Sequence, residues 1–291
     1  MKCNRLVALF FVLAQAGWVV AQGPPAIQIE NSLTYGKGGE SDLMLDLALP
    51  TQGNGPFPAV ICIHGGSWKS GKRQDLSQIV KTLASRGFVA ATVSYRFMQD
   101  AKFPAQIEDC KAAVRWLRAH AAQYKIDKDH VGVVGFSAGG HLACLLGTTG
   151  KEDNLEGAGG SPDQPSGVQA VVDFFGPTDF TTKDWSEDVE TKTLTPFLGD
   201  TFANRPDLYR RASPILYVKP NSPPFLILHG TEDKTVSIRQ SRSFAKKLEE
   251  AGVSVKLIEV PDAGHGWRGD QLLKSIEQMV GFFDIQLRPK R

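Results

Sequence analysis

The stretch Val131-Gly132-Val133-Val134-Gly135-Phe136-Ser137-Ala138-Gly139 decides the fold. Its Val-rich first half predicts a buried strand, and a helix is expected from about Ala138. Glycines on both sides of Ser137 allow a tight strand-to-helix turn without side-chain clashes. Such a turn lifts the serine hydroxyl above the sheet edge, with the positive end of the helix dipole beneath it. A helix-capping serine is the plainer interpretation, but the preceding strand disfavours it. Ser137 is therefore a candidate nucleophile.

Apolar runs alternate with helix-period segments on both sides of this stretch. The expected strands are 27–35, 43–49, 59–63, 88–95, 131–136, 168–175, 225–229 and 253–260. The first two flank a Gly-rich turn and predict a hairpin. Near-continuous Val- and Ile-rich runs between amphipathic helices indicate an α/β fold, with a mostly parallel sheet of about eight strands and helices on both faces.

One segment, 176–214, has little periodicity. Connections of this length are usually functional loops or lids, so we expect a small lid insertion within one catalytic domain that spans 22–291. The insertion contains Phe180, Trp185, Phe197 and Phe202. They either contact a planar acyl group or a sugar ring, or simply pack the insertion.

Residues 1–21 resemble a signal peptide. Lys2 and Arg5 precede an apolar run over 6–20, and small residues stand at 19–21. The run is short for a membrane span, which needs about 20 apolar residues, although an uncleaved anchor is the alternative. We expect a secreted or periplasmic protein with no membrane attachment after cleavage.

Charge and cysteine usage exclude several classes of function. The chain has 33 Lys and Arg against 31 Asp and Glu, and 1–21 hold two of the cations, so the remainder has no net charge. No basic field is left to attract nucleic acid or an anionic membrane. Cys62, Cys110 and Cys144 lack metal-site spacing, and the first two lie in apolar patterns typical of buried thiols. Neither a metal nor a cofactor is implied.

A serine hydroxyl needs a base within hydrogen-bond reach. Asp233 follows the strand 225–228, and His265 follows the strand that ends at 260. Both fall at carboxyl ends of strands, and the order serine, acid, histidine is that of the serine hydrolases whose nucleophile occupies such a turn. We therefore predict Asp233 and His265 as catalytic. His229 is interpreted as structural, and Glu232 is expected to point elsewhere. Asp262 is too close in sequence to orient the ring. The histidines on or beside helices are interpreted as unremarkable: His120, His130 and His141.

Acyl transfer also needs donors for a tetrahedral oxyanion. His64-Gly65-Gly66-Ser67-Trp68 follows the strand 59–63, where a loop that supplies backbone N–H groups belongs. We expect Gly66, together with Gly65 or Ser67, to form the oxyanion hole with Ala138. His64 is interpreted as a brace for this loop. Trp68 and Trp267 are expected substrate contacts.

With these motifs the chain resembles bacterial α/β-hydrolase esterases related to the hormone-sensitive-lipase group, and in particular their feruloyl and acetylxylan esterase-like branch. The resemblance runs from about Tyr35 to the end. Besides the loops above it includes Leu45-Asp46-Leu47, Phe103 to Leu142, Phe175-Gly176-Pro177-Thr178-Asp179 and Ser213-Pro214. It implies a serine esterase without a cofactor.

Two departures bear on the branch. The lipase-like relatives usually have a third glycine where Ser67 stands, and residues 22–58 are too short for their N-terminal helical cap. Both favour the polysaccharide-esterase-like branch. We expect hydrolysis of short-chain or aromatic acyl esters, either as small molecules or linked to a polysaccharide.

Two alternative functions are considered. One is a peptidase resembling prolyl oligopeptidases, although their propeller domain is missing. The other is an inactive binding protein, which the intact serine, acid and histidine disfavour.

Overall fold

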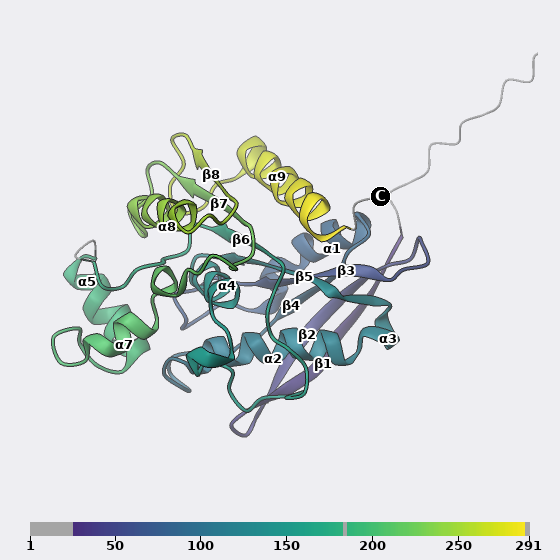
Figure 1. Ribbon diagram of the computed structural model, residues 1–291, viewed down its shortest axis with the longest axis horizontal. Helices are drawn as coiled ribbons and strands as arrows, with labels where there is room; N and C mark the ends of the chain where they lie inside the picture. The colour runs from purple at the N-terminus through teal and green to yellow at the C-terminus, as the bar shows by residue number, and fades with distance from the viewer. Residues whose placement is uncertain (1–25, 183–184, 289–291) are drawn as a thin grey trace, which may run out of the picture.

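The computed structural model describes residues 26–182 and 185–288, so the signal peptide predicted at 1–21 lies outside the described residues. Within those ranges one sheet is formed by β1 Ile27–Gly38, β2 Ser41–Pro50, β3 Phe57–Ile63, β4 Val89–Val93, β5 Ile126–Phe136, β6 Ala170–Phe174, β7 Phe225–Gly230 and β8 Val255–Val260. The strand order is β1-β2-β4-β3-β5-β6-β7-β8 (Figure 1). Strand β2 is antiparallel to β1 and β4, and all other neighbours are parallel. The predicted eight-stranded, mostly parallel sheet is confirmed.

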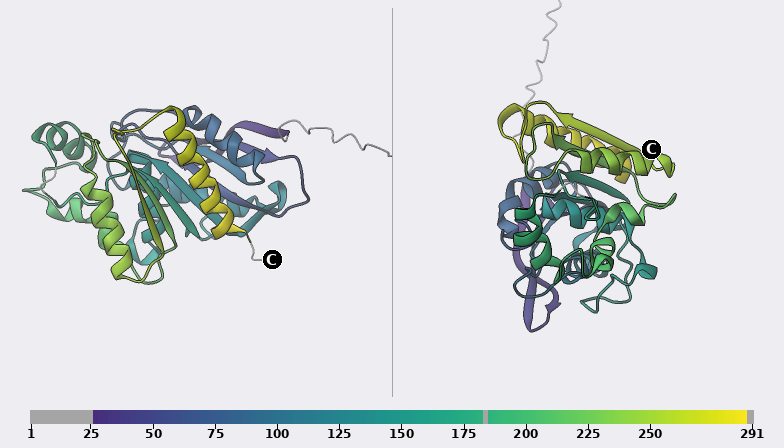
Figure 2. Two further views of the ribbon diagram at one scale, coloured as in Figure 1. Left: turned by 90° about the horizontal axis from the view of Figure 1, so that it is seen from above. Right: turned by 90° about the vertical axis from the view of Figure 1, so that its left-hand side faces the viewer.

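Helices cover both faces of the sheet. Helices α1 (Ser77–Ser85) and α9 (Gly269–Leu287) pack on one face, and α2 (Ala105–Ala119), α4 (Ala138–Thr148) and α8 (Arg239–Glu250) on the other. Figure 2 shows α9 lying across the sheet. On β3, Val60 and Cys62 belong to the first apolar layer, and Ile61 and Ile63 to the second. Burial on both sides explains why the central strands are continuously apolar.

The irregular stretch between α4 and β6 is held down by charged side chains of α2. Lys111 is fully buried, and its Nζ lies 2.7 Å from Oε1 of Glu156. Arg115 donates to the same carboxylate and to the carbonyl oxygens of Gly159 and Gly160. Within this stretch, η2 (Lys151–Asp153, a 3-10 turn) is the one regular element among the described residues; the short α3 (Ala121–Tyr124) follows α2, and another 3-10 turn, η1 (Arg73–Leu76), precedes α1. The buried ion pair thus fixes a segment that is not held by the backbone hydrogen bonds of a strand.

The insertion consists of helical turns that the sequence pattern does not reveal. They are α5 (Glu187–Val189), a π-helical turn η3 (Glu190–Leu194), α6 (Thr195–Leu198), α7 (Pro206–Arg211) and a 3-10 turn η4 (Pro214–Tyr217). Elements of one or two turns are too short to show a helical period. Figure 1 shows α5 and α7 to one side of the sheet. Phe180 and Phe197 are buried in the same apolar layer as α2 and α4, so both pack the insertion rather than face a ligand.

The strand register brings the predicted functional loops together. Ile63 pairs with Gly135, Phe136 with Phe174, and Phe174 with Leu228. The loops after β3, β5, β6, β7 and β8 therefore meet at one edge, where open α/β sheets place their sites. No helix in the described ranges is both long enough and apolar enough to cross a bilayer.

Candidate active site

Ser137 stands on a sharp turn between β5 and α4. Its backbone is left-handed at φ 54°, a conformation that costs energy for any residue except glycine. A β-carbon on Gly135 would lie 2.0 Å from the carbonyl oxygen of Gly139, and one on Gly139 would lie 2.2 Å from that of Ile63. Both flanking positions therefore require glycine. The Ser137 N–H donates to the Phe174 carbonyl oxygen at 2.8 Å, which ties the turn to β6.

The three predicted catalytic side chains form one hydrogen-bonded chain. Nε2 of His265 lies 2.8 Å from Oγ of Ser137, and Nδ1 lies 2.7 Å from Oδ2 of Asp233. A carboxylate only accepts, so Nδ1 carries the ring proton and Nε2 is free to accept the serine proton. These distances satisfy the requirement for a general base. The structure thus brings together residues that are 128 and 32 positions apart.

Asp233 is buried and fully hydrogen-bonded. Its Oδ1 accepts the N–H groups of Thr235 and Val236 at 2.8 and 3.0 Å, and its Oδ2 also lies 3.1 Å from Nε2 of His229. Burial by itself would raise the pKa of Asp233, but the hydrogen bonds from His229, His265 and Val236 outweigh it and hold this pKa well below its usual range. The carboxylate therefore stays charged and keeps His265 in one tautomer.

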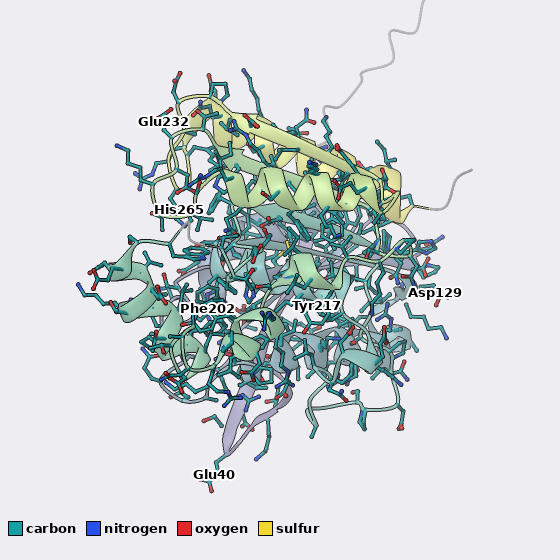
Figure 3. The ribbon with its side chains drawn as sticks, turned by 60° about the vertical axis from the view of Figure 1, so that its left-hand side comes forward. Glu40, Asp129, Phe202, Tyr217, Glu232 and His265 are labelled. Atoms are coloured by element: carbon teal, nitrogen blue, oxygen red, sulfur yellow. The ribbon has the colours of Figure 1, made fainter. Side chains whose placement is uncertain are left out.

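The alternative residues lie where the sequence analysis predicts. His229 is buried, with Nδ1 at 2.7 Å from Oγ of Ser241 and Nε2 at 2.8 Å from the carbonyl oxygen of Val236, so it is structural and supports Asp233. Glu232 is exposed, and Figure 3 shows it at the outer end of the loop cluster that carries His265. Asp262 is also exposed. Among the described residues, the His265 ring is hydrogen-bonded to Ser137 and Asp233 and to neither of these carboxylates.

The predicted oxyanion loop lies against the nucleophile. A β-carbon on Gly65 would lie 3.2 Å from the β-carbon of Ser137, and one on Gly66 only 2.1 Å from the carbonyl oxygen of Ser70. In the described part of the chain, the backbone N–H groups of Gly66 and Ser67 donate to no protein acceptor. Ala138 begins α4, where the first N–H groups of a helix have no partner within it. Donors of this kind are what an oxyanion hole requires.

His64 braces this loop from behind. Its ring is buried and stacks on Tyr95 at 4.5 Å, and Nδ1 lies 2.7 Å from the carbonyl oxygen of Gly65. Ser67 has a φ of 52° and Trp68 one of 56°, both left-handed. The third glycine of the lipase-like relatives corresponds to Ser67, where this backbone favours glycine. The chain tolerates serine there because neighbouring contacts hold the loop.

The prediction that Trp68 contacts substrate is wrong. Trp68 is 3% exposed, its ring stacks on Phe197 at 4.2 Å, and its indole N–H donates to Nδ1 of His141. Apolar side chains of the insertion cover the ring, and His141 accepts the hydrogen bond from its indole N–H. Trp267 is half-buried; its indole N–H donates to Ser275 and its ring packs on Phe175. Its contact with substrate stays a prediction.

The interpretation of His141 as an unremarkable helix residue is wrong, and Asp173 is a second buried polar residue near the nucleophile that sequence patterns do not single out. His141, in α4, joins Trp68 to the insertion. Asp173, in β6, accepts the Gly176 N–H at 2.8 Å through Oδ1. The only signal for either is a polar residue within an apolar run, which is weak. Cys62, Cys110 and Cys144 are buried free thiols, as expected for the first two. No group of three or more metal-ligating side chains occurs among the residues that the structure describes.

Comparison with known proteins agrees with this geometry. The model of the BD-FAE family matches residues 45–248. Esterase LipQ of Mycobacterium tuberculosis is 32% identical over 241 residues, which are 81% of this chain and 57% of the relative. The chain thus spans little more than half of that protein's length.

Solved structures give fuller coverage. A truncated carbohydrate esterase from gut microbiota superposes with a TM-score of 0.79 at 29% identity, over 91% of this chain and 98% of the other. A thermophilic esterase from Thermogutta terrifontis, solved with propionate bound, has a TM-score of 0.76 at 28% identity, over 92% and 97%. The predicted fold and the resemblance to serine esterases are confirmed.

Proposed function

Since the chain belongs to the BD-FAE family of α/β-hydrolase esterases, we propose that it is a serine carboxylesterase acting on short-chain or aromatic acyl esters. The observation that carries this proposal is the contact of 2.8 Å between Nε2 of His265 and Oγ of Ser137, with Asp233 behind the ring. A serine that touches a neutral imidazole in this way can be deprotonated as it attacks.

The reaction follows from the geometry in two steps. Oγ of Ser137 attacks the ester carbonyl carbon while Nε2 of His265 takes the hydroxyl proton. The oxyanion is held by backbone N–H groups of the Gly65–Ser67 segment and Ala138. Collapse expels the alcohol, which receives its proton from His265 and leaves an acyl group on Ser137. Water, deprotonated by the same imidazole, then releases the carboxylic acid.

The acyl group and the alcohol are narrower parts of the proposal. We infer acetyl or feruloyl groups on plant cell-wall polysaccharide, because one structural relative is named a carbohydrate esterase. The relative with propionate bound supports a short acyl group. Ser67, which stands where the lipase-like relatives have a third glycine, supports the polysaccharide-esterase-like branch. No nucleic acid or metal enters this reaction.

Secretion is a separate part of the proposal and depends on residues 1–21 alone. Their two cations, apolar run and small residues at 19–21 are the basis for it. Amino-terminal sequencing of protein recovered from outside the cytoplasm should begin at or near Gln22. Recovery of material that still begins with Met1 would contradict cleavage.

A three-substrate assay tests the activity. p-Nitrophenyl acetate, a feruloyl ester and a peptide anilide are offered to the wild type and to Ser137→Ala. We expect ester turnover by the wild type and a loss of several orders of magnitude in the variant. A fluorophosphonate should label Ser137 alone. Faster cleavage of the anilide would instead indicate a peptidase, and labelling at another serine would refute the assignment.

A further inference from the structure

The oxyanion loop is clamped between the nucleophile helix and the insertion. Trp68, directly after Ser67, lies 73 residues from His141 in sequence, yet its indole N–H donates to the Nδ1 of that histidine at 3.2 Å. Nε2 of the same ring lies 2.7 Å from the carbonyl oxygen of Ala212, where α7 ends. Both side chains are buried. One histidine therefore links three segments: the loop, α4 and the insertion.

The tautomer of His141 follows from its partners. A carbonyl oxygen only accepts, so Nε2 must carry the proton toward Ala212, and Nδ1 is left with a lone pair. An indole N–H only donates, which matches that lone pair. Burial lowers the pKa of His141 to about 4, so the ring is neutral at neutral pH. The arrangement is complementary in one protonation state only.

The backbone of the loop needs such support. Gly66, Ser67 and Trp68 have consecutive left-handed φ values of 116°, 52° and 56°. Such conformations are unfavourable for a non-glycine residue and persist only where surrounding contacts enforce them. The Trp68 ring supplies these contacts, since it stacks on Phe197 with ring planes 10° apart and meets Phe180 edge-on. The backbone carbonyl oxygen of Trp68 also accepts a hydrogen bond from the Met98 N–H at 2.8 Å.

We propose that Trp68 and His141 are a positioning pair, whose hydrogen bond holds the oxyanion loop in its catalytic conformation and couples that loop to the insertion. This inference rests on the proposed function. The pair touches no reacting atom. It acts because the Gly65–Ser67 backbone is fixed on one side by Ser137 and on the other by the indole. The insertion is accordingly a buttress for the oxyanion hole, in addition to any role as a lid.

Trp68→Phe tests the hydrogen bond while keeping an aromatic ring for Phe197. Loss of one oxyanion donor costs about 10²–10³ in kcat, so a displaced donor should cost less. We expect kcat for p-nitrophenyl butyrate to fall about 10- to 100-fold, with KM within about twofold of the wild type. The inhibition constant of a short trifluoromethyl ketone, which forms an oxyanion on the serine, should rise by the same factor as kcat/KM falls.

His141 variants separate positioning from packing. His141→Leu removes both hydrogen bonds and should behave like Trp68→Phe. His141→Gln offers an acceptor and a donor in place of the ring nitrogens, and it should restore kcat to within about threefold of the wild type. The matched control is Trp116→Phe, a buried indole in α2 that stacks on His120 at 4.1 Å, far along the chain from the loop. It should lower the melting temperature without changing kcat.

Hydrogen exchange in segment 64–70 supplies a readout that needs no turnover. Exchange should accelerate in Trp68→Phe and His141→Leu, but in neither His141→Gln nor Trp116→Phe. Unchanged kcat and exchange in Trp68→Phe would overturn the pair, and so would a glutamine variant as impaired as the leucine variant. A wild type without esterase activity would refute the proposed function instead. Hydrogen exchange in 64–70 would then be the sole test of whether Trp68 and His141 hold the loop.

Discussion

Gly65 lies so close to Ser137 that a β-carbon built on the glycine would stand 3.2 Å from the β-carbon of the serine and 2.8 Å from the carbonyl oxygen of Phe136. The second distance is shorter than real β-carbons show, and the atom it meets is backbone, which cannot rotate away. The close approach places the oxyanion loop over the nucleophile. It is possible only because residue 65 has no side chain.

Gly65→Ala should therefore reduce activity by moving the loop. The methyl group pushes the loop or the Ser137 turn outward by a few tenths of an ångström, which displaces the oxyanion donors from the reacting carbonyl. We expect kcat for a short ester to fall at least about 100-fold, in the range seen when an oxyanion donor is removed. Steady-state kinetics and a thermal melt check this. A folded variant with the kcat of the wild type would contradict the close approach of Gly65 to Ser137.

The roles of the two nearby aspartates can be separated by one pair of variants. Asp233→Asn keeps the shape of the side chain but favours the wrong His265 tautomer, so kcat should fall about 10⁴-fold. Asp262→Asn changes an exposed carboxylate only three residues from the histidine and should leave kcat within about twofold. Kinetics of both proteins at one pH give the answer. Equal losses in the two variants would contradict Asp233 as the partner of His265.

Two buried groups beside the nucleophile respond to pH in opposite directions. Burial lowers the pKa of His141 from 6.5 to about 4, so the unfolded chain binds this proton first and stability falls as pH drops from about 6.5 to 4. Burial raises the pKa of Asp173 from 3.8 to about 6, so the folded chain binds that proton first and stability falls as pH rises from about 4 to 6. Between pH 4 and 6 the two contributions oppose each other.

Asp173→Asn isolates the contribution of Asp173, because His141 is present in both the variant and the wild type. The variant lacks the cost of a charged, buried carboxylate. Its free energy of unfolding minus that of the wild type should therefore be about 2 kcal/mol larger at pH 7.5 than at pH 4.5, which means that the amide stabilises the fold more at the higher pH. Urea unfolding of both proteins at the two pH values measures this difference, and any constant effect of the amide cancels. An equal difference at both pH values would show that Asp173 does not titrate in this range.

The sheet and the three catalytic candidates were predictable for one reason. Each of Ser137, Asp233 and His265 lies in the turn or loop that follows a strand, and parallel strands bring their carboxyl ends to the same edge. Local order along the chain thus specifies distant neighbours in space. The glycines around Ser137 were equally predictable, because the turn leaves no room for a side chain.

Contacts that depend on side-chain direction were not predictable. Trp68 adjoins the oxyanion glycines in sequence, which favoured a role in substrate binding, yet its ring turns away into the core. His141 looks like any helix residue until Trp68 and Ala212 are placed around it. The insertion shows the same limit, since its turns are held by packing of Phe180 and Phe197 and carry no period of their own.

The aromatic residues of the insertion also bear on acyl chain length. Phe180 and Phe197 are buried, and Trp185 and Phe202 are partly buried against the same core, so much of this aromatic surface is committed to packing. The oxyanion loop is tied down on both sides and leaves little freedom for a channel to open. A long acyl chain gains affinity only where methylenes are buried, at about 0.8 kcal/mol each.

We therefore expect acetyl to butyryl p-nitrophenyl esters to be cleaved well and palmitoyl esters poorly. The measurement is kcat/KM for each ester below its micellar concentration, because that ratio reports differential binding of the transition state. A feruloyl ester tests whether Phe202 or Trp267, both half-buried, stacks on a planar acyl group, an interaction worth about 0.5–1.5 kcal/mol. Phe202→Ala should then lower kcat/KM for the feruloyl ester about 2- to 10-fold and leave that for acetate unchanged. A palmitoyl ester that outperforms the butyryl ester would reveal an apolar channel and make the enzyme a lipase.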